Sequence, residues 1–506
     1  MWILFLVVVL VVAVLDAERK GKKKRIKEAF DYNPVNAHGA AKFVHNNKDL
    51  KKLFKGKGVP IGYSPDGRHA LHYPGFGHIL TIAAARTGKD LTLLVNALLS
   101  WRYSVVVIDP KCENAAITGH WRKRFGKTFV LNPFGMLSDA LKGLKQAHIN
   151  PMDILDAASL SFHAGCDKLA AALVWDEGRE GMHFTTAARM LVSGVIAALV
   201  QHGEESEKNL PTVARVISGD VFGFCRLVLQ STTDPFIIQK LGRFAAQGAE
   251  ASREVMDVVS TAITQLGFIG NAAIAECLSG SDFRFSDLKR KPGTTVYICL
   301  PLNMLDICDK FFRLLLEVFL WDVLDEGQRG KGKPVLAIVD EMAQLGPHMK
   351  SLENAMGMAA GAAGIQLWCV LQDLSQLKGM FVNTWETFIQ NCGVTMWFGA
   401  RDQTTRDYCS KLSGTCEVLS CSRSITIDRC TGEPIVNDSA TQYGRPLLLP
   451  HEVGELAPDE MIAFVEGVHG VIRAKRKTYL SEFRGKYREN PYFGKDGGGL
   501  LGWLFR

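Results

Sequence analysis

A glycine–lysine pair at positions 88 and 89 is the first feature of this sequence that suggests chemistry. It lies between an apolar run from Ile79 to Ala84, typical of a short buried strand, and an apolar helical run from Leu91 to Leu99. A loop between a strand and a helix can direct backbone N–H groups and the positive end of the helix at phosphate oxygens. The spacing therefore predicts a nucleotide-binding loop made by five consecutive residues: Arg86, Thr87, Gly88, Lys89 and Asp90.

The loop departs from the usual pattern, G-x-x-x-x-G-K-[ST], at two positions. Ala83 replaces the first glycine, which is a mild change because a small residue still allows close backbone approach. Asp90 is the larger departure, since it brings a carboxylate to the position where a hydroxyl normally contacts Mg²⁺. Asp90 either ligates the metal directly or weakens nucleotide binding. The alternative for the whole motif is a glycine C-cap or an ordinary strand–helix turn.

Polar residues also follow two later apolar runs. Asp340 and Glu341 come directly after the run Val335–Val339, and Gln372 follows the run Gln366–Leu371. Open α/β sheets bind ligands at the carboxyl ends of their strands. In a P-loop ATPase, Asp340 would hold Mg²⁺, Glu341 would polarise the attacking water, and Gln372 would sense the γ-phosphate or orient that water. Each residue alone is equally consistent with a helix N-cap, but the three in this order favour ATP hydrolysis.

The length and composition of the chain limit its domain number, its partners and its redox compartment. With 506 residues, 47% of them hydrophobic, the chain is long enough for two or more domains with their own cores. A net charge of +7 permits contact with DNA or anionic lipid, but it is not the charge of a dedicated nucleic-acid coat. The twelve cysteines include no C-x-x-C pair, which favours free thiols in a reducing compartment. A zinc site at Cys409, Cys416, Cys421 and Cys430 is the weaker alternative.

The amino terminus is an unbroken apolar run over residues 1–15, followed by a lysine-rich cluster. A signal peptide would need a charged region before the run, and a core helix would not normally begin at residue 1. We therefore predict a membrane anchor, although the run is shorter than the about 20 residues of a typical spanning helix. Arg19–Lys27 would then lie at the cytoplasmic face, against lipid headgroups.

The remaining pattern predicts a nucleotide-binding domain that is interrupted by a helical insertion. Residues 16–67 are predicted as a basic connector, and 68–150 and 284–484 as two parts of one α/β domain whose alternating strands and helices indicate a mostly parallel sheet. Residues 151–283 carry apolar residues at helical spacing and predict an all-helical domain. Residues 414–444 indicate a hairpin or a mobile loop, Arg473–Lys477 a solvated basic face rather than a DNA contact, and 485–506 a flexible tail.

These motifs together resemble the TraG/TraD family of type IV secretion coupling proteins, membrane ATPases that feed DNA into conjugation machinery. The matching segments follow the family's order over most of the chain: HILTIAAARTGKD, SVVVIDPKCENAAIT, HFTTAARML, PVLAIVDEMAQLG, GIQLWCVLQDLSQLKGMF, TWETFIQNCGVTMWFGARDQTT and RPLLLPHEVGEL. The blocks around Asp340-Glu341 and Gln372–Lys378 are the most specific. The block around Lys89 is the poorest match, although relatives often carry glycine at the Asp90 position.

The resemblance implies a P-loop (RecA-like) fold with an inserted all-helical domain and an anchor in the bacterial inner membrane. It also implies a hexameric ring that uses ATP and Mg²⁺ to drive single-stranded DNA, with its attached relaxase, into a type IV secretion channel. Family members usually carry two membrane helices, so the single run at residues 1–15 predicts an abbreviated or truncated anchor.

The arginine that completes the site in related motors is missing from its usual place in this sequence. Ring-shaped P-loop motors complete each site with an arginine from the neighbouring subunit, and Met358–Ala363, the corresponding region here, contains none. Arg401 and Arg406 are the substitute candidates, against the alternative of ordinary surface salt bridges. The rival functions are a non-hydrolysing docking receptor for relaxase and channel, and a chromosome-partition or repair translocase.

Overall fold

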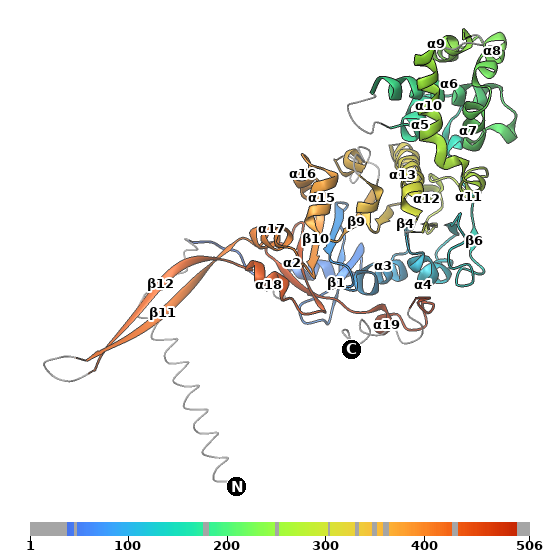
Figure 1. Ribbon diagram of the computed structural model, residues 1–506. Helices are drawn as coiled ribbons and strands as arrows, with labels where there is room; N and C mark the ends of the chain where they lie inside the picture. Colours follow the sequence, from blue (N-terminus) through green and yellow to red (C-terminus); the bar gives the residue numbers. More distant parts are fainter. Residues whose placement is uncertain are drawn as a thin grey trace. The chain divides into compact units, whose positions relative to one another are not determined.

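The computed structural model describes residues 38–492, except for 45–47, 176–181, 248–251, 302–303, 329–332, 347–351, 358–363 and 428–433. The chain divides into two compact units (Figure 1). One unit joins residues 43–409 to 450–506, and the other joins 1–42 to 410–449. The predicted anchor, the cluster at Arg19–Lys27, the arginine-free region at 358–363 and the tail beyond residue 492 lie outside the described residues.

A 12-stranded sheet forms the centre of the larger unit as far as it is described, in the order β2-β1-β14-β13-β10-β3-β9-β8-β4-β7-β5-β6. Its strands are β1 (Val59–Tyr63), β2 (Ala70–Tyr73), β3 (His78–Ala83), β4 (Ser104–Ile108), β5 (Thr128–Leu131), β6 (Lys145–Gln146), β7 (Thr295–Ile298), β8 (Val335–Val339), β9 (Ile365–Leu371), β10 (Cys392–Phe398), β13 (Glu460–Val465) and β14 (Ile472–Lys475). Neighbours from β10 to β6 run parallel. The strands β13, β14, β1 and β2 extend the sheet in antiparallel fashion.

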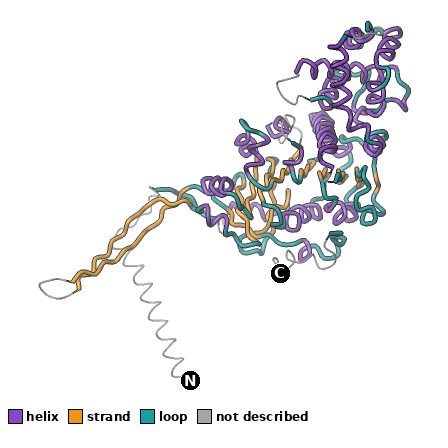
Figure 2. The backbone as a smooth tube through the Cα atoms, in the orientation of Figure 1, coloured by secondary structure: helices purple, strands orange, loops and turns teal. Residues whose placement is uncertain are grey.

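Burial explains why the parallel strands read as continuous apolar runs. Every residue of β3, β4, β5, β7, β8 and β9 is buried, because helices cover both faces of such a sheet. Figure 2 shows these strands with helices packed beside them. The predicted α/β class and mostly parallel sheet are therefore confirmed.

The helices fall into two groups. Those between β6 and β7 are α5 (Phe162–Leu173), α6 (Met182–His202), α7 (Leu210–Ser218), α8 (Val221–Ser231), α9 (Pro235–Ala245), α10 (Arg253–Leu266), α11 (Ala272–Cys277) and α12 (Asp287–Arg290), with the short turns η3 (Pro151–Ile154), η4 (Glu205–Glu207) and η5 (Gly267–Gly270). The others are α2 (Lys48–Lys52), η1 (Leu53–Lys55), η2 (Asp90–Leu94), α3 (Val95–Ser100), α4 (Glu113–Arg122), α13 (Leu305–Gln328), η7 (Met342–Leu345), α15 (Leu374–Met380), α16 (Trp385–Gln390), α17 (Gln403–Ser413), α18 (Pro450–Gly454) and α19 (Tyr479–Glu482).

Capping side chains set the starts of the helices in the insertion. The backbone N–H groups at the starts of α7 to α11 donate to side-chain oxygens of Asn209, Asp220, Asp234, Ser252 and Asn271. Among the helices that the structure describes, α6 alone is long and apolar enough to cross a membrane. Because 67% of its most apolar stretch is buried among the neighbouring helices, α6 has the packing of a core helix.

The smaller unit contains a long hairpin, the first of the two alternatives predicted for residues 414–444. Its strands β11 (Thr415–Ile427) and β12 (Pro434–Pro446) pair antiparallel over their full length. The described segment before residue 43 joins the base of the hairpin, where Ala41 N–H donates to Thr415 O at 3.0 Å. A segment in the middle of the predicted connector is therefore attached to this hairpin.

Two predicted boundaries differ from the structure. The connector was predicted to end at residue 67, but β1 already pairs with β2 and β14 in the central sheet. The tail was predicted to be flexible from residue 485, but Arg488 N–H donates to Ile117 O at 2.9 Å. The β14 partner of β1 and the Ile117 partner of Arg488 are both distant in the sequence, so no local pattern predicts these two contacts.

Candidate active site

The loop between β3 and η2 has the backbone of an anion-binding turn. Arg86 (φ 63°) and Gly88 (φ 78°) both lie in the left-handed region, which glycine adopts readily and arginine rarely. Thr87 Oγ1 donates to Ala84 O at 2.6 Å and closes the turn. Left-handed residues within such a turn produce a concave row of N–H groups, and the helix that begins after Lys89 adds its positive end. This segment can therefore cradle a phosphate group.

Lys89 meets both predicted acids. Its Nζ lies 2.8 Å from Asp340 Oδ1 and 2.7 Å from Glu341 Oε1, although 251 residues separate Lys89 from Asp340. The sheet explains the meeting, because β3 and β8 both pair with β9 and all three run parallel. Their carboxyl ends therefore reach the same edge of the sheet.

Burial makes this a strong electrostatic cluster. Burial alone would lower the pKa of Lys89, but the charges of Asp340, Asp90 and Glu341 raise it above its ordinary value. Burial would raise the pKa of Glu341, but the Lys89 ammonium and a hydrogen bond from Gln372 lower it on balance. Lys89 and Glu341 are thus held as a charged pair near neutral pH. Glu341 also has a left-handed backbone (φ 52°), an unusual conformation of the kind that concentrates at functional sites.

Gln372 joins the same network from the end of β9. Its Nε2 donates to Glu341 Oε2 at 2.9 Å, and its backbone N–H donates to Gln376 Oε1 at 2.9 Å. The neighbouring Asp373 is a helix N-cap, which accepts from Gln376 N–H at 2.9 Å. The structure therefore brings Lys89, Asp340, Glu341 and Gln372 into one hydrogen-bonded cluster.

Asp90 lies beside this cluster but has a different environment. Its Oδ1 is buried and has no hydrogen-bond partner among the described residues. Burial and the nearby charge of Asp340 raise the pKa of Asp90 well above its ordinary value. A divalent cation beside Asp90 and Asp340 would offset both effects, so these residues fit Mg²⁺.

The protein side chains alone would not complete such a metal site. Within the described ranges, no three His, Cys, Asp or Glu side chains converge closely enough to hold an ion. Mg²⁺ usually takes one or two carboxylates and fills its remaining positions with phosphates and water. Elsewhere, Cys409 and Cys416 are free thiols, and Cys430 lies outside the described residues.

Two further acids, which the sequence did not assign to the site, surround this edge of the sheet. Asp109 follows β4 as Asp340 follows β8, and it accepts from Ala115 N–H at 2.8 Å. Burial, together with the charges of Asp340 and Glu113, raises the pKa of Asp109 to about 7. Burial also raises the pKa of Glu113, whose carboxylate accepts a hydrogen bond from Asn490 Nδ2. Asp109 could have been identified from its position at a strand end, but Glu113 had no such signal.

The two candidate arginines differ in what they contact. Arg406 Nε donates to Ala400 O at 3.0 Å, and its guanidinium packs so closely on Gly454 that an added Cβ there would lie 2.7 Å away. Arg401 is exposed just beyond the end of β10. Of the two, Arg401 has the more exposed side chain.

The predicted basic face at Arg473–Lys477 is wrong in one essential respect. Arg473 and Lys475 form ion pairs with Glu460, as surface residues do. Arg476, in contrast, is only 4% exposed and donates to Thr87 O in the phosphate loop at 3.0 Å. The basic residues at 473–477 do not indicate that Arg476 is buried, because Thr87, the partner of Arg476, lies 389 residues earlier in the chain.

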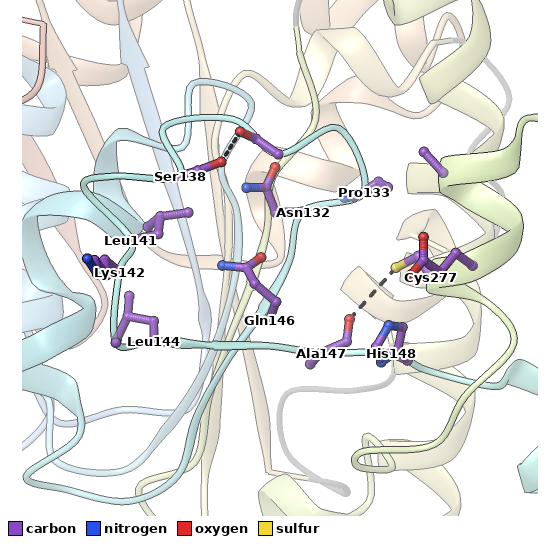
Figure 3. Close-up of a pocket in the computed structure, with 14 residues that line it drawn as sticks. Asn132, Pro133, Ser138, Leu141, Lys142, Leu144, Gln146, Ala147, His148 and Cys277 are labelled. Carbon is purple, nitrogen blue, oxygen red and sulfur yellow. Dashed lines mark hydrogen bonds between the residues drawn. The ribbon is translucent and has the colours of Figure 1, made fainter.

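A separate cavity of about 310 Å³ lies between residues 132–148 and α11 (Figure 3). Asn132, Gln146 and His148 contribute polar groups to its lining, and Cys277 Sγ contacts Ala147 O at 4.0 Å. Its lining includes neither the phosphate loop nor Asp340. We therefore locate the candidate active site at the Lys89 cluster and not in this cavity.

Sequence comparison gives a consistent set of relatives. Residues 23–495 match the family described as Type IV secretory system Conjugative DNA transfer. Conjugal transfer protein TraG of Escherichia coli is 27% identical over 446 residues, with 82% of this chain and 68% of TraG covered. Type IV secretion system-coupling protein VirD4 of Bartonella henselae is 26% identical (80% and 63% covered), and protein VirD4 of Agrobacterium fabrum is 26% identical (80% and 59% covered). The chain thus spans about two thirds or less of the length of these relatives.

Solved structures with a similar fold include the bacterial conjugative coupling protein TrwBdeltaN70 in an unbound form. The TM-score is 0.63 at 17% identity, with 86% of this chain and 92% of that chain covered. TrwB in complex with ADP and Mg²⁺ gives a TM-score of 0.63 at 17% identity (87% and 94% covered). TrwB with the non-hydrolysable ATP analogue ADPNP gives 0.63 at 16% identity (88% and 96% covered). At these identities the comparison establishes a common fold.

Proposed function

Because the chain belongs to the type IV secretory system conjugative DNA transfer family, we propose that it is a coupling ATPase whose hydrolysis drives single-stranded DNA into a secretion channel. The observation that carries the proposal is the convergence of Lys89, Asp340, Glu341 and Gln372 at one edge of the sheet. A lysine, two acids and a glutamine around a phosphate-binding loop are the groups that phosphoryl transfer to water requires.

Each residue has a role that follows from its contacts. The loop N–H groups from Arg86 to Asp90 bind phosphate oxygens, and Lys89 neutralises the charge of the β- and γ-phosphates. Glu341 accepts a proton from the attacking water, while Gln372 holds the Glu341 carboxylate and orients that water. When phosphates draw the Lys89 ammonium away, Glu341 loses the charge that lowers its pKa and becomes a better base.

Asp340 and Asp90 are the residues that would hold Mg²⁺. The ion supplies positive charge to the phosphates as negative charge develops on them. Support comes from the buried, unpartnered Asp90 Oδ1 and from the TrwB structure that contains ADP and Mg²⁺. Arg401, which is exposed, is our candidate for the arginine that a neighbouring subunit contributes.

The names of the relatives support a cellular role for the proposed ATP hydrolysis. Relatives are named as conjugal transfer and type IV secretion system-coupling proteins, which supports a membrane-associated role in transfer. We propose that residues 1–15 anchor the chain in the bacterial inner membrane lipid, with most of the chain in the cytoplasm. A hexameric ring would then pass relaxase-bound DNA to the channel proteins and grip its phosphates without regard to sequence.

ATP hydrolysis by the full-length protein is the direct test. We expect Lys89→Ala to lower the hydrolysis rate by about a hundredfold or more, because the loop loses the ammonium group that we assign to the terminal phosphates. Lys89→Ala also leaves two buried carboxylates unpaired, which costs about 3–5 kcal/mol of stability. A melting curve for each variant is therefore the control, and Lys89→Arg provides a second variant that keeps the charge.

A non-hydrolysing docking receptor is the second candidate, and Asp90 is the observation that favours it. In its ionised form the Asp90 carboxylate would repel bound phosphates, just as the nearby charge of Asp340 already raises its pKa. Asp90→Thr separates the two cases when hydrolysis is titrated with Mg²⁺. If Asp90 ligates the metal, the variant needs more Mg²⁺ for the same rate. No hydrolysis in the wild type or in any variant would overturn the motor and favour the receptor.

A further inference from the structure

Arg476 is a buried cation that contacts the phosphate loop from a distant part of the chain. It follows β14, which pairs with β13 and β1 in the antiparallel part of the sheet. Its guanidinium carbon lies 3.7 Å from the centre of the Phe398 ring at the end of β10, and Nη2 donates to Pro458 O. These contacts fix the plane of the guanidinium group.

A second nitrogen of the guanidinium group, Nη1, contacts the loop at two points. Arg476 Nη1 donates to Thr87 O at 3.0 Å and to Thr92 Oγ1 at 3.1 Å. The Thr92 hydroxyl in turn donates to Gly88 O at 2.7 Å. Arg476 therefore holds the Thr87 carbonyl directly, and through the Thr92 hydroxyl it reinforces the Gly88 carbonyl, which also accepts from Thr92 N–H at 3.0 Å.

Peptide geometry gives these bonds a consequence for ligand binding. In a trans peptide the C=O and N–H groups point in opposite directions, and no described peptide bond is cis. A hydrogen bond that holds Thr87 O therefore directs the N–H of Gly88 to the opposite side. By the same argument, the bond to Gly88 O directs the N–H of Lys89 away from Thr92.

We propose that Arg476 is a positioning residue that fixes the phosphate-binding loop in its anion-binding conformation before nucleotide arrives. The proposal rests on the proposed function only in assigning a nucleotide as the anion. Burial lowers the pKa of Arg476 to about 9, so the group remains a cation at neutral pH. Its charge and its hydrogen bonds then both favour a bound phosphate.

The first experiment measures the loop without nucleotide. We expect Arg476→Gln in the full-length protein to increase amide hydrogen exchange about tenfold over residues 86–92, because glutamine cannot make the same fork of bonds. Arg473→Gln is the matched control, since Arg473 lies three residues earlier, on β14, but is exposed and pairs with Glu460 at 2.6 Å. Unchanged exchange in Arg476→Gln would overturn the proposal.

The second experiment measures affinity with a fluorescent ATP analogue in the presence of Mg²⁺. We expect Arg476→Gln to weaken binding about tenfold, Arg476→Lys to weaken it less, and Arg473→Gln to leave it unchanged. Millimolar guanidinium ion should restore binding to Arg476→Ala, whereas equal KCl should not. Restoration requires a folded protein with an empty guanidinium site, so it separates positioning from general unfolding.

The two readouts also separate this proposal from the proposed function. If the wild type binds no nucleotide but Arg476→Gln still loosens the loop, the ATPase proposal fails and the positioning role stands. If the wild type binds nucleotide and Arg476→Gln binds it equally well, the positioning role fails and the ATPase proposal stands.

Discussion

Lys89 is a cation that two carboxylates already neutralise before any phosphate arrives. Its Nζ lies within 2.8 Å of both Asp340 and Glu341, and all three groups are buried. A phosphate that binds the loop must therefore compete with two acids for one ammonium group. In the proposed mechanism this competition would link nucleotide binding to activation, because the displacement of Lys89 would also free Glu341 to act as a base. Nucleotide affinity and hydrolysis should consequently respond together to changes in this cluster.

The residues of this cluster could be predicted because each occupies a marked position in the sequence. Asp340 and Gln372 directly follow apolar strands, and Lys89 follows a glycine in a strand–helix loop. Arg476 could not be predicted, because its burial depends on a strand pairing and on Thr87 and Thr92, more than 380 residues away. Polar residues at the ends of apolar strands can be recognised from the local sequence, whereas Arg476, which supports the phosphate loop, cannot.

His78 should make stability depend on pH. Its ring is buried, with Nδ1 accepting from Leu367 N–H at 3.1 Å, so Nε2 carries the proton and donates to Ala355 O at 3.2 Å. Burial lowers the pKa of His78 to about 4 from 6.5. Since the unfolded chain binds the proton first, stability is full above pH 6.5 and falls by about 3 kcal/mol as pH drops toward 4.

Denaturant unfolding at several pH values measures this loss of stability in the wild type and in His78→Gln. Glutamine can keep both hydrogen bonds but does not titrate. The variant should lose less stability than the wild type between pH 6.5 and 4. His183→Gln, at an exposed site, is the control. Parallel pH curves for the wild type and His78→Gln would show that the histidine does not carry the effect.

At the scale of elements, the burial of a strand determines whether its bounds can be predicted from the sequence. The apolar run at Val335–Val339 has the observed bounds of β8, because a strand that is buried on both faces has no polar interruptions. In β14 (Ile472–Lys475), buried and accessible positions alternate, and the strand reads as part of a basic run. Its place in the sheet follows from pairing with β13 and β1, which a single sequence does not encode locally.

The junction between β10 and the phosphate loop should tolerate no side chain at Gly399. This residue has φ 62°, and a Cβ there would lie 2.3 Å from Thr87 Cγ2. We expect Gly399→Ala to destabilise the protein by about 1–3 kcal/mol and to weaken nucleotide binding, because the strained backbone and the clash both displace the loop. Thermal unfolding and nucleotide titration measure the two effects.

A second substitution tests the cause of the loss. Thr87→Ser removes Cγ2 but keeps the hydroxyl that bonds to Ala84 O, so it should restore part of what Gly399→Ala loses. Gly267→Ala is the control, because no atom lies within 4 Å of its added Cβ. Equal losses in the single and double variants would mean that Thr87 is not the group displaced.

At the scale of the whole molecule, the first and last described segments of the larger unit both pack around the candidate active site. Val59 and Ile61 of β1 share one apolar core with Ile472 of β14, which brings Arg476 to the phosphate loop. Beyond α19, Asn490 contacts Glu113, and Tyr492 OH donates to Lys111 O at 2.8 Å. The final described residues therefore belong to the structure that surrounds the site. Truncation before residue 485 would remove these contacts as well as the predicted tail.

The ring proposal predicts how mixed assemblies behave. Glu341→Gln is the suitable inactive subunit, because it should slow hydrolysis about a hundredfold or more while Lys89 keeps its bond to Asp340. If neighbouring subunits complete one another's sites and act in concert, co-expressed wild-type and Glu341→Gln subunits should hydrolyse ATP at well below half the wild-type rate when mixed equally. Two affinity tags select the mixed assemblies, and a mixture of two differently tagged wild-type chains is the control. A rate that follows the wild-type fraction in a straight line would mean that each subunit works alone, which would contradict a cooperative ring.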